Sequence, residues 1–185
     1  MGYSLSWFAA KTLDLDELCA AVPMEPTEVA DPRWESPLCG GIWRDGWYLV
    51  IAGRSCSRLV EPQILRSLSA SYPVVACSIE EHVMATEAYY WNEGKLTWSV
   101  KHQSELDLYH LEALGELPAF YQEIERSHIR EQDHEQSHAA EVDFIFEVPL
   151  EMAKAVTAFK HDEEPPESFC PRAFHDLRKP WWRFW

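Results

Sequence analysis

The segment His134-Glu135-Gln136-Ser137-His138 has residue types and a spacing that are typical of a metal site. On a helix, this H-E-x-x-H pattern places two imidazoles one turn apart, where both can bind a zinc ion, and it positions Glu135 to activate a metal-bound water. The flanking residues 130–133 are hydrophilic, whereas such a helix is normally apolar on the side that faces the core. We therefore favour a solvated helix end without a metal. A zinc-dependent hydrolase that uses His134 and His138, with Glu135 as the general base, is kept as an alternative.

Two other places in the sequence carry residues of the kinds that act in catalysis. Cys56 lies between an expected strand and an expected helix, and a helix N-terminus activates a thiol as a nucleophile. Glu80-Glu81-His82 lies at a strand junction, from which a carboxylate can reach His102 for acid–base chemistry. Ordinary packing and hydrogen-bonded sheet ends have the same composition. We therefore assign no catalytic residue and no cofactor, and we expect a protein that is not an enzyme.

The composition excludes several classes of partner. The 185 residues carry a formal net charge of -15, from 31 acidic and 16 basic residues. This charge repels phosphate backbones and anionic lipids, so we expect neither nucleic-acid nor membrane binding. It attracts a basic partner, although an acidic surface also serves simply to keep a cytosolic protein soluble. The chain has no glycine-rich phosphate loop.

The cysteines and the first residues indicate a cytoplasmic protein. Five cysteines are scattered without a C-x-x-C pair, which is typical of reduced thiols. Residues 1–11 lack the basic and apolar regions of a secretory signal. The sequence does not distinguish a monomer from a homodimer.

The elements that position these residues centre on residues 73–102, which are dominated by aromatic and β-branched side chains. Residues 74–79 predict a buried strand, and Asn92-Glu93-Gly94-Lys95 predicts a turn between two longer strands. Alternation predicts a first strand over residues 3–11, and Asp45-Gly46 predicts a hairpin that leads into a fully buried strand over 47–52. The prediction is an α+β fold with a central, mainly antiparallel sheet of about six strands and helices packed on it.

The remaining segments give the helices and the domain boundary. Helices are expected from Asp14 or Asp16 to Val22, from Ser55 or Ser57 to Pro73 with Pro62 in the first turn, over 106–114, from Pro118 into the polar residues 125–141, and from Pro149 to Phe159. Prolines predict a loop over 23–41, and alternation predicts a strand over 142–148. Residues 1–160 are expected to form a single domain. Residues 161–185 are expected to form an acidic linker and a Trp-rich tail that packs on the domain or docks to a partner, as a scaffold protein would.

Several segments together resemble small acidic bacterial proteins of toxin–immunity loci. They are Asp45-Gly46-Trp47-Tyr48-Leu49-Val50, Val74-Val75-Ala76-Cys77, Glu80-Glu81-His82-Val83-Met84, Trp91 and Trp98-Ser99-Val100-Lys101-His102. The similarity extends over most of residues 3–161 and lies in pattern, without a catalytic signature; the tail does not belong to it. It implies an immunity-type protein that binds a cognate toxin and blocks it.

Charge and residue type suggest which side chains would contact such a toxin. A nuclease or another nucleic-acid-directed toxin carries a basic groove, which acidic side chains complement. The expected contact residues are acidic side chains of the loops and the polar helix, with an aromatic residue as an anchor: Glu80, Glu81, Glu131, Asp133, Glu135, and Trp34 or Tyr89.

Overall fold

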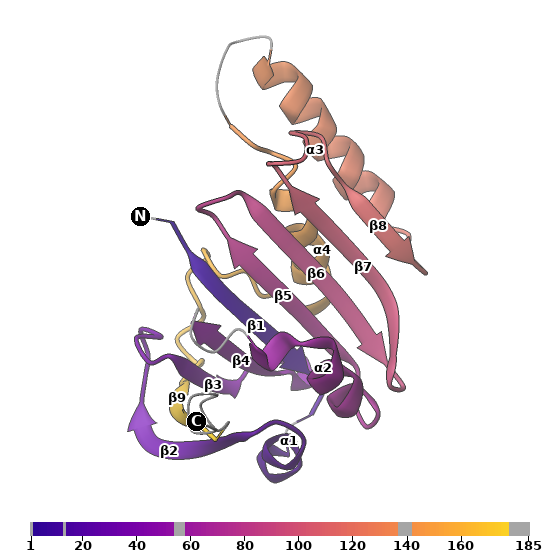
Figure 1. Cartoon of the computed structure of the whole chain (residues 1–185). Helices are drawn as coiled ribbons and strands as arrows, with labels where there is room; N and C mark the ends of the chain where they lie inside the picture. The colour runs from indigo at the N-terminus through magenta and orange to yellow at the C-terminus, as the bar shows by residue number, and fades with distance from the viewer. Residues whose placement is uncertain (1, 13, 54–57, 137–141, 178–185) are drawn as a thin grey trace, which may run out of the picture.

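The computed structural model describes residues 2–12, 14–53, 58–136 and 142–177 (Figure 1). The strands are β1 Ser4–Ala10, β2 Met24–Ala30, β3 Leu38–Ile42, β4 Tyr48–Gly53, β5 Val74–Glu80, β6 Ala85–Asn92, β7 Lys95–Gln103, β8 Glu112–Gly115 and β9 Arg172–Asp176. The helices are α1 Leu15–Ala21, α2 Pro62–Ser69, α3 Tyr121–Gln136 and α4 Glu147–Thr157, with a 3₁₀ turn, η1, at Arg44–Gly46.

The strands of the described residues form one antiparallel sheet, in the order β2-β9-β3-β4-β1-β5-β6-β7-β8. This confirms the α+β class and the antiparallel sheet, although its nine strands exceed the expected six. β1 lies in the middle and pairs with β4 on one side and β5 on the other. Its neighbours Trp7 and Phe8 point to opposite faces, and each is only 1% exposed.

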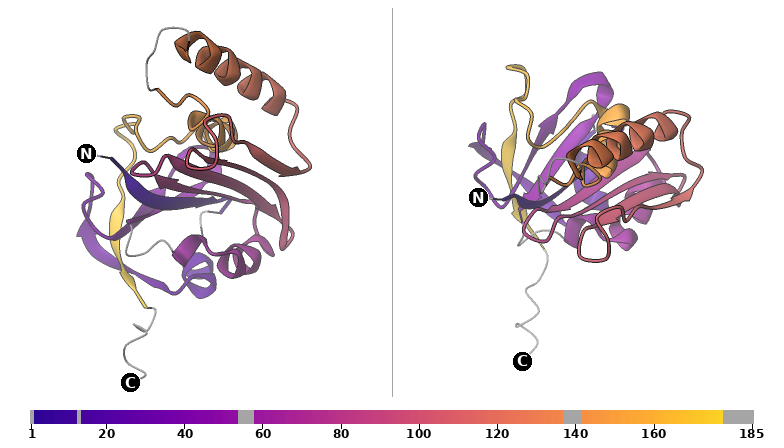
Figure 2. Two further views of the ribbon diagram at one scale, coloured as in Figure 1. Left: turned by 45° about the horizontal axis from the view of Figure 1, so that its top comes forward. Right: turned by 90° about the horizontal axis from the view of Figure 1, so that it is seen from above.

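Each face of the sheet has its own apolar core. Helices α3 and α4 cover one face, where Trp7 and Phe146 belong to one cluster of buried residues. Helices α1 and α2 cover the other face, where Phe8 and Leu65 belong to a second cluster. Figure 1 views the sheet from the α2 side, with α4 behind it, and Figure 2 shows the two layers from other directions.

The α2 side of the sheet is only partly covered. The end of α2 meets the β6–β7 hairpin, where the Gly94 amide donates to the Ser69 carbonyl at 3.0 Å. Beyond this contact, no helix of the described chain lies over the outer halves of β6, β7 and β8 (Figure 1). We call this uncovered surface the open sheet face. It carries Glu87 and Tyr89 of β6, Ser99 and Lys101 of β7, and Glu112 and Leu114 of β8.

Several local predictions are confirmed. The Asp14 side chain caps α1 by accepting from the Glu17 amide at 3.0 Å. Pro62 lies in the first turn of α2, where its missing N–H leaves no hydrogen bond unmade. The hairpin residues Asp45, Gly46 and Gly94 have positive φ values of 55°, 75° and 70°, as tight reversals require.

The prediction of a loop over residues 23–41 was wrong, because β2 and β3 lie within it. β2 is an edge strand of the sheet, so Pro26 removes no hydrogen bond that a second neighbour would need. In β3, a side chain at Gly40 would come within 2.5 Å of the Leu49 carbonyl oxygen, so glycine permits the close approach of β4.

Two further predictions of secondary structure were wrong. Residues 104–111 form turns rather than a helix, and Glu112–Gly115 form β8, an edge strand that gains its hydrogen bonds from β7. Residues 142–146 form a turn rather than a strand. Consecutive residues Ile145 and Phe146 are both buried there, at 1% and 4% exposure, which a strand with one buried face does not allow.

The segment after residue 160 contributes a strand to the interior of the sheet. β9 lies between β2 and β3, where Arg172 pairs with Gly40 and Ala30. Residues 178–185, the expected docking tail, lie outside the described residues.

The loop between β2 and β3 is organised by one buried carboxylate. Asp31 is 6% exposed and accepts from the amides of Glu35 and Ser36, both at 2.9 Å. Burial alone would raise the pKa of Asp31, but the hydrogen bonds from Ser36, Glu35 and Cys39 outweigh it and lower the pKa below its usual value. The ionised carboxylate therefore stabilises the fold.

We predict that Asp31→Asn lowers the free energy of unfolding by about 2 kcal/mol at pH 7, because the amide presents a donor where two donors already converge. Since the folded pKa is lowered, the Asp31 contribution is complete above the unfolded pKa of about 3.9 and is lost as the pH falls through the folded pKa. Urea titrations of both proteins should show their difference shrinking below about pH 4. A difference that is independent of pH would contradict this role.

Candidate partner-binding surface

A row of polar side chains runs from β1 across the α2 side of the sheet to the open sheet face, at directly paired positions of neighbouring strands. In register, Ser6 of β1 pairs with Ser78 of β5, Ser78 with Glu87 of β6, Glu87 with Lys101 of β7, and Lys101 with Glu112 of β8. Paired positions place side chains on the same face of a sheet. The ammonium of Lys101 is therefore flanked by carboxylates on both neighbouring strands.

The middle of this row is held by polar contacts. The Tyr89 hydroxyl donates to Glu87 Oε2, and Lys101 Nζ lies 3.7 Å from Glu87 Oε1 and 5.7 Å from the centre of the Tyr89 ring. Burial raises the pKa of Tyr89, and the hydrogen bond to Glu87 and its charge raise it further. Tyr89 is therefore a neutral donor at physiological pH.

An apolar strip runs beside the charged row. Tyr89, Ser99 and Leu114 are paired across β6, β7 and β8. Ser99 is small and 2% exposed, whereas Leu114 is 52% exposed. The strip and the charged row together give the open sheet face the mixed composition of a protein-binding surface.

The structure places the predicted contact residues Glu80 and Glu81 at the end of β5. Glu80 lies on the same side of the sheet as the open sheet face but in β5, and it accepts from the Ser4 hydroxyl at 2.6 Å. Glu81 accepts from the Tyr3 amide at 2.7 Å and lies 3.5 Å from His161 Nε2. Glu81 therefore ties the first strand and the segment after α4 to the β5–β6 turn.

The predicted residues Glu131, Asp133 and Glu135 lie on α3, on the other side of the sheet. Glu131 and Glu135 line a shallow groove of about 470 Å³ beside Phe144. Asp133 accepts from the Tyr109 hydroxyl at 2.7 Å, and this hydrogen bond raises the pKa of Tyr109. The structure therefore does not bring the α3 carboxylates together with Glu80.

The two predicted aromatic anchors have different surroundings. Tyr89 is on the open sheet face. Trp34 packs against the buried rings of Phe159 and Phe169, with ring centres 5.8 Å and 6.3 Å away. It has a φ of 56° in the loop that Asp31 organises.

The residues proposed for metal or thiol chemistry are only partly described. His134 and Glu135 lie on the last turns of α3 beside the groove, and His138 lies outside the described residues, as does Cys56. Within the described chain, no three potential metal-ligating side chains converge. Burial raises the pKa of the Cys39 thiol to about 12 and also raises that of Cys77, so these two thiols are not activated.

His102 forms a buried pair with Asp143, not with Glu80 or Glu81, which were considered as acid–base partners but not favoured. Its Nδ1 lies 2.7 Å from the His110 carbonyl oxygen, and its Nε2 lies 2.9 Å from Asp143 Oδ2. A carbonyl oxygen only accepts, so Nδ1 donates to His110, while Nε2 contacts the Asp143 carboxyl group. With both nitrogens engaged and the His102 side chain 0% exposed, the pair fastens the 142–146 turn to β7.

Sequence reasoning missed Glu87, Lys101 and Glu112. The sequence of the two long strands could have indicated them. Buried and less buried residues alternate in these strands, and Glu87, Tyr89 and Lys101 are at the less buried positions. Their convergence also needed the pairing of β8 with β7, in a segment that was predicted to be helical.

Comparisons of the chain with protein-family models, with curated protein sequences and with solved structures each gave no match. None of the described helices combines the length and the apolar character needed to cross a bilayer.

The outer half of α3 is fastened by the Gln132 side chain. Gln132 is 1% exposed; its Nε2 donates to the Val142 carbonyl at 2.9 Å and its Oε1 accepts from the Phe144 amide at 2.7 Å. We predict that Gln132→Ala costs about 2 kcal/mol and increases hydrogen exchange in the last turns of α3, because two backbone groups lose their partner. The exposed Gln122→Ala is the control. Equal exchange in the two variants would show that Gln132 does not fasten the helix.

Proposed function

We propose that this protein is an immunity-type inhibitor, which neutralises a cognate bacterial toxin by binding it directly. The open sheet face supports this proposal most strongly. On this face the carboxylates of Glu87 and Glu112 flank the ammonium of Lys101. They adjoin the apolar strip that ends at Leu114. This arrangement suits a basic protein surface with an apolar centre.

The charge of the chain favours the same kind of partner. A net charge of -15 accelerates the encounter with a basic toxin at low salt and repels acidic competitors. The Glu87–Lys101 pair at 3.7 Å is partly exposed and contributes little to the stability of the fold, so an incoming guanidinium can take the place of Lys101 beside Glu87. Tyr89 and Leu114 then provide the contacts that slow dissociation.

The α3 carboxylates are a second region of contact in this proposal. Glu131 and Glu135 line the groove next to Phe144, on a helix whose outer half is bonded through Gln132 to the backbone of residues 142 and 144. The two alternatives depend on residues outside the described chain: His138 for a zinc-dependent hydrolase, and residues 178–185 for a docking scaffold.

We predict that the double variant Glu87→Gln/Glu112→Gln binds the toxin encoded by the neighbouring gene at least tenfold more slowly at low salt, because the local attraction is lost. The matched control is Glu28→Gln/Glu35→Gln, which removes the same charge from exposed positions of β2 and the following loop. Stopped-flow association of the purified proteins measures the rates, and urea titration checks that each variant folds.

Co-expression provides the biological readout. The wild-type chain should rescue cells from the toxin, and the Glu87→Gln/Glu112→Gln variant should rescue them less well than the control. Absence of a complex, or of any rescue by the wild-type chain, would overturn the proposed function. A normal complex with equal association rates for both variants would overturn the assignment to the open sheet face.

A further inference from the structure

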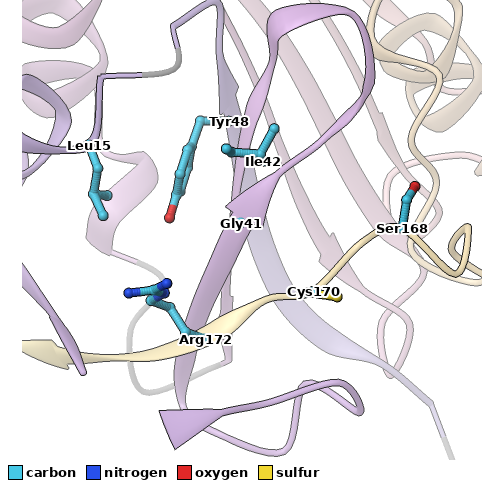
Figure 3. A pocket seen from close by; sticks show the side chains of 7 residues that line it. All are labelled: Leu15, Gly41, Ile42, Tyr48, Ser168, Cys170 and Arg172. Atoms are coloured by element: carbon cyan, nitrogen blue, oxygen red, sulfur yellow. The ribbon is translucent and has the colours of Figure 1, made fainter. Parts of the chain in front are cut away.

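A cavity of about 290 Å³ lies at the opposite end of the α2 side, between the start of α1 and strands β3, β4 and β9. Figure 3 shows the side chains around it. Tyr48 and Leu15 lie beside Arg172, and the Tyr48 hydroxyl points toward the Arg172 guanidinium. The cavity is far from the open sheet face in strand order, since four strands separate β4 from β8.

The sheet register explains why there is space at this point. Gly40 of β3 pairs with Arg172 on one side and with Val50 on the other. A glycine at this position leaves no side chain between the guanidinium and the β4 side chains. The next residue of β3 on the same face is Ile42, which pairs with Tyr48 and is 58% exposed at the cavity.

Two hydrogen-bond donors of the cavity, Tyr48 and Arg172, have no acceptor among the described residues. Tyr48 is 4% exposed, and among the described residues no hydrogen bond engages its hydroxyl. Nor does any described carboxylate form an ion pair with Arg172, although the chain has 31 acidic residues. The Tyr48 side chain is largely buried, and its hydroxyl faces the exposed guanidinium of Arg172. Two donors that face each other across a cavity suit an anionic acceptor placed between them.

The hydroxyl also keeps its proton. Burial raises the pKa of Tyr48 to about 12, and the positive charge of Arg172 opposes part of this rise. Tyr48 is therefore a neutral donor throughout the physiological range, and the guanidinium beside it remains charged.

We propose that this cavity binds a small organic carboxylate, held by Arg172 and the Tyr48 hydroxyl with its apolar part against Leu15 and Ile42. A guanidinium matches the two oxygens of a carboxylate with two parallel N–H donors, and a tyrosine hydroxyl adds a third donor. The exposed Ile42 side chain and Leu15 give the ligand an apolar surface to cover, which an inorganic anion would leave in water. The site is independent of the proposed toxin binding.

Benzoate is a suitable probe, because it joins a carboxylate to an apolar ring. Isothermal titration of the full chain should give a dissociation constant on the order of 1 mM, typical of a fragment of this size. Benzyl alcohol, which keeps the ring without the charge, and inorganic phosphate, which keeps charge without the ring, should both bind more weakly.

Substitutions of Arg172 and Tyr48 measure how much each donor contributes to benzoate binding. Arg172→Gln should weaken benzoate binding at least tenfold, and Tyr48→Phe about fivefold, whereas Arg66→Gln on the exposed side of α2 should leave binding unchanged. If Tyr48→Phe does not fold, Arg172→Gln still decides the matter, because its side chain is exposed. The proposal is overturned if benzoate shows no saturable binding, if benzyl alcohol or phosphate binds as tightly, or if Arg172→Gln binds like the wild type.

Discussion

The two-sided burial of β1 is the constraint on which the rest of the structure depends. Trp7 and Phe8 are adjacent in sequence, each is 1% exposed, and each anchors a different apolar cluster. A strand buried on both faces must also have both edges paired, and β1 obtains these hydrogen bonds from β4 and β5. A shift of register by one residue would exchange the two clusters, so the pairing is strongly specified.

The helices do not cover this sheet equally, and the uncovered part carries the proposed function. α3 and α4 bury the side that holds Trp7, and they are locked by buried polar contacts such as Gln132 to the 142–144 backbone and His102 to Asp143. On the other side, α1 and α2 leave the outer halves of β6–β8 open (Figure 1). Side chains such as Glu112 and Leu114 are exposed there and are available to a partner.

The parts of the fold that depend on local chemistry were predictable from the sequence. The Asp14 cap, Pro62 at the start of α2 and the Gly94 hairpin follow from side-chain and backbone preferences that act over a few residues. The buried strands 48–53 and 74–80 follow from continuous apolar runs.

The parts that depend on distant partners were not predictable. β2, β8 and β9 are short or proline-bearing strands, and their hydrogen bonds come from segments far away in the chain. Their weak alternation resembles that of loops or helices. The same holds for the candidate surface. Tyr89 was predicted as a contact residue, whereas Glu112 joins it only through the pairing of β8 with β7.

Side-chain footprinting of the complex with the toxin tests the central claim most directly. Hydroxyl radicals modify exposed side chains, and mass spectrometry locates the modified residues with and without the partner. If the partner binds the open sheet face, Tyr89 and Leu114 lose reactivity in the complex, whereas the exposed Val29 of β2 does not. Unchanged reactivity of Tyr89 and Leu114 in a saturated complex would contradict it.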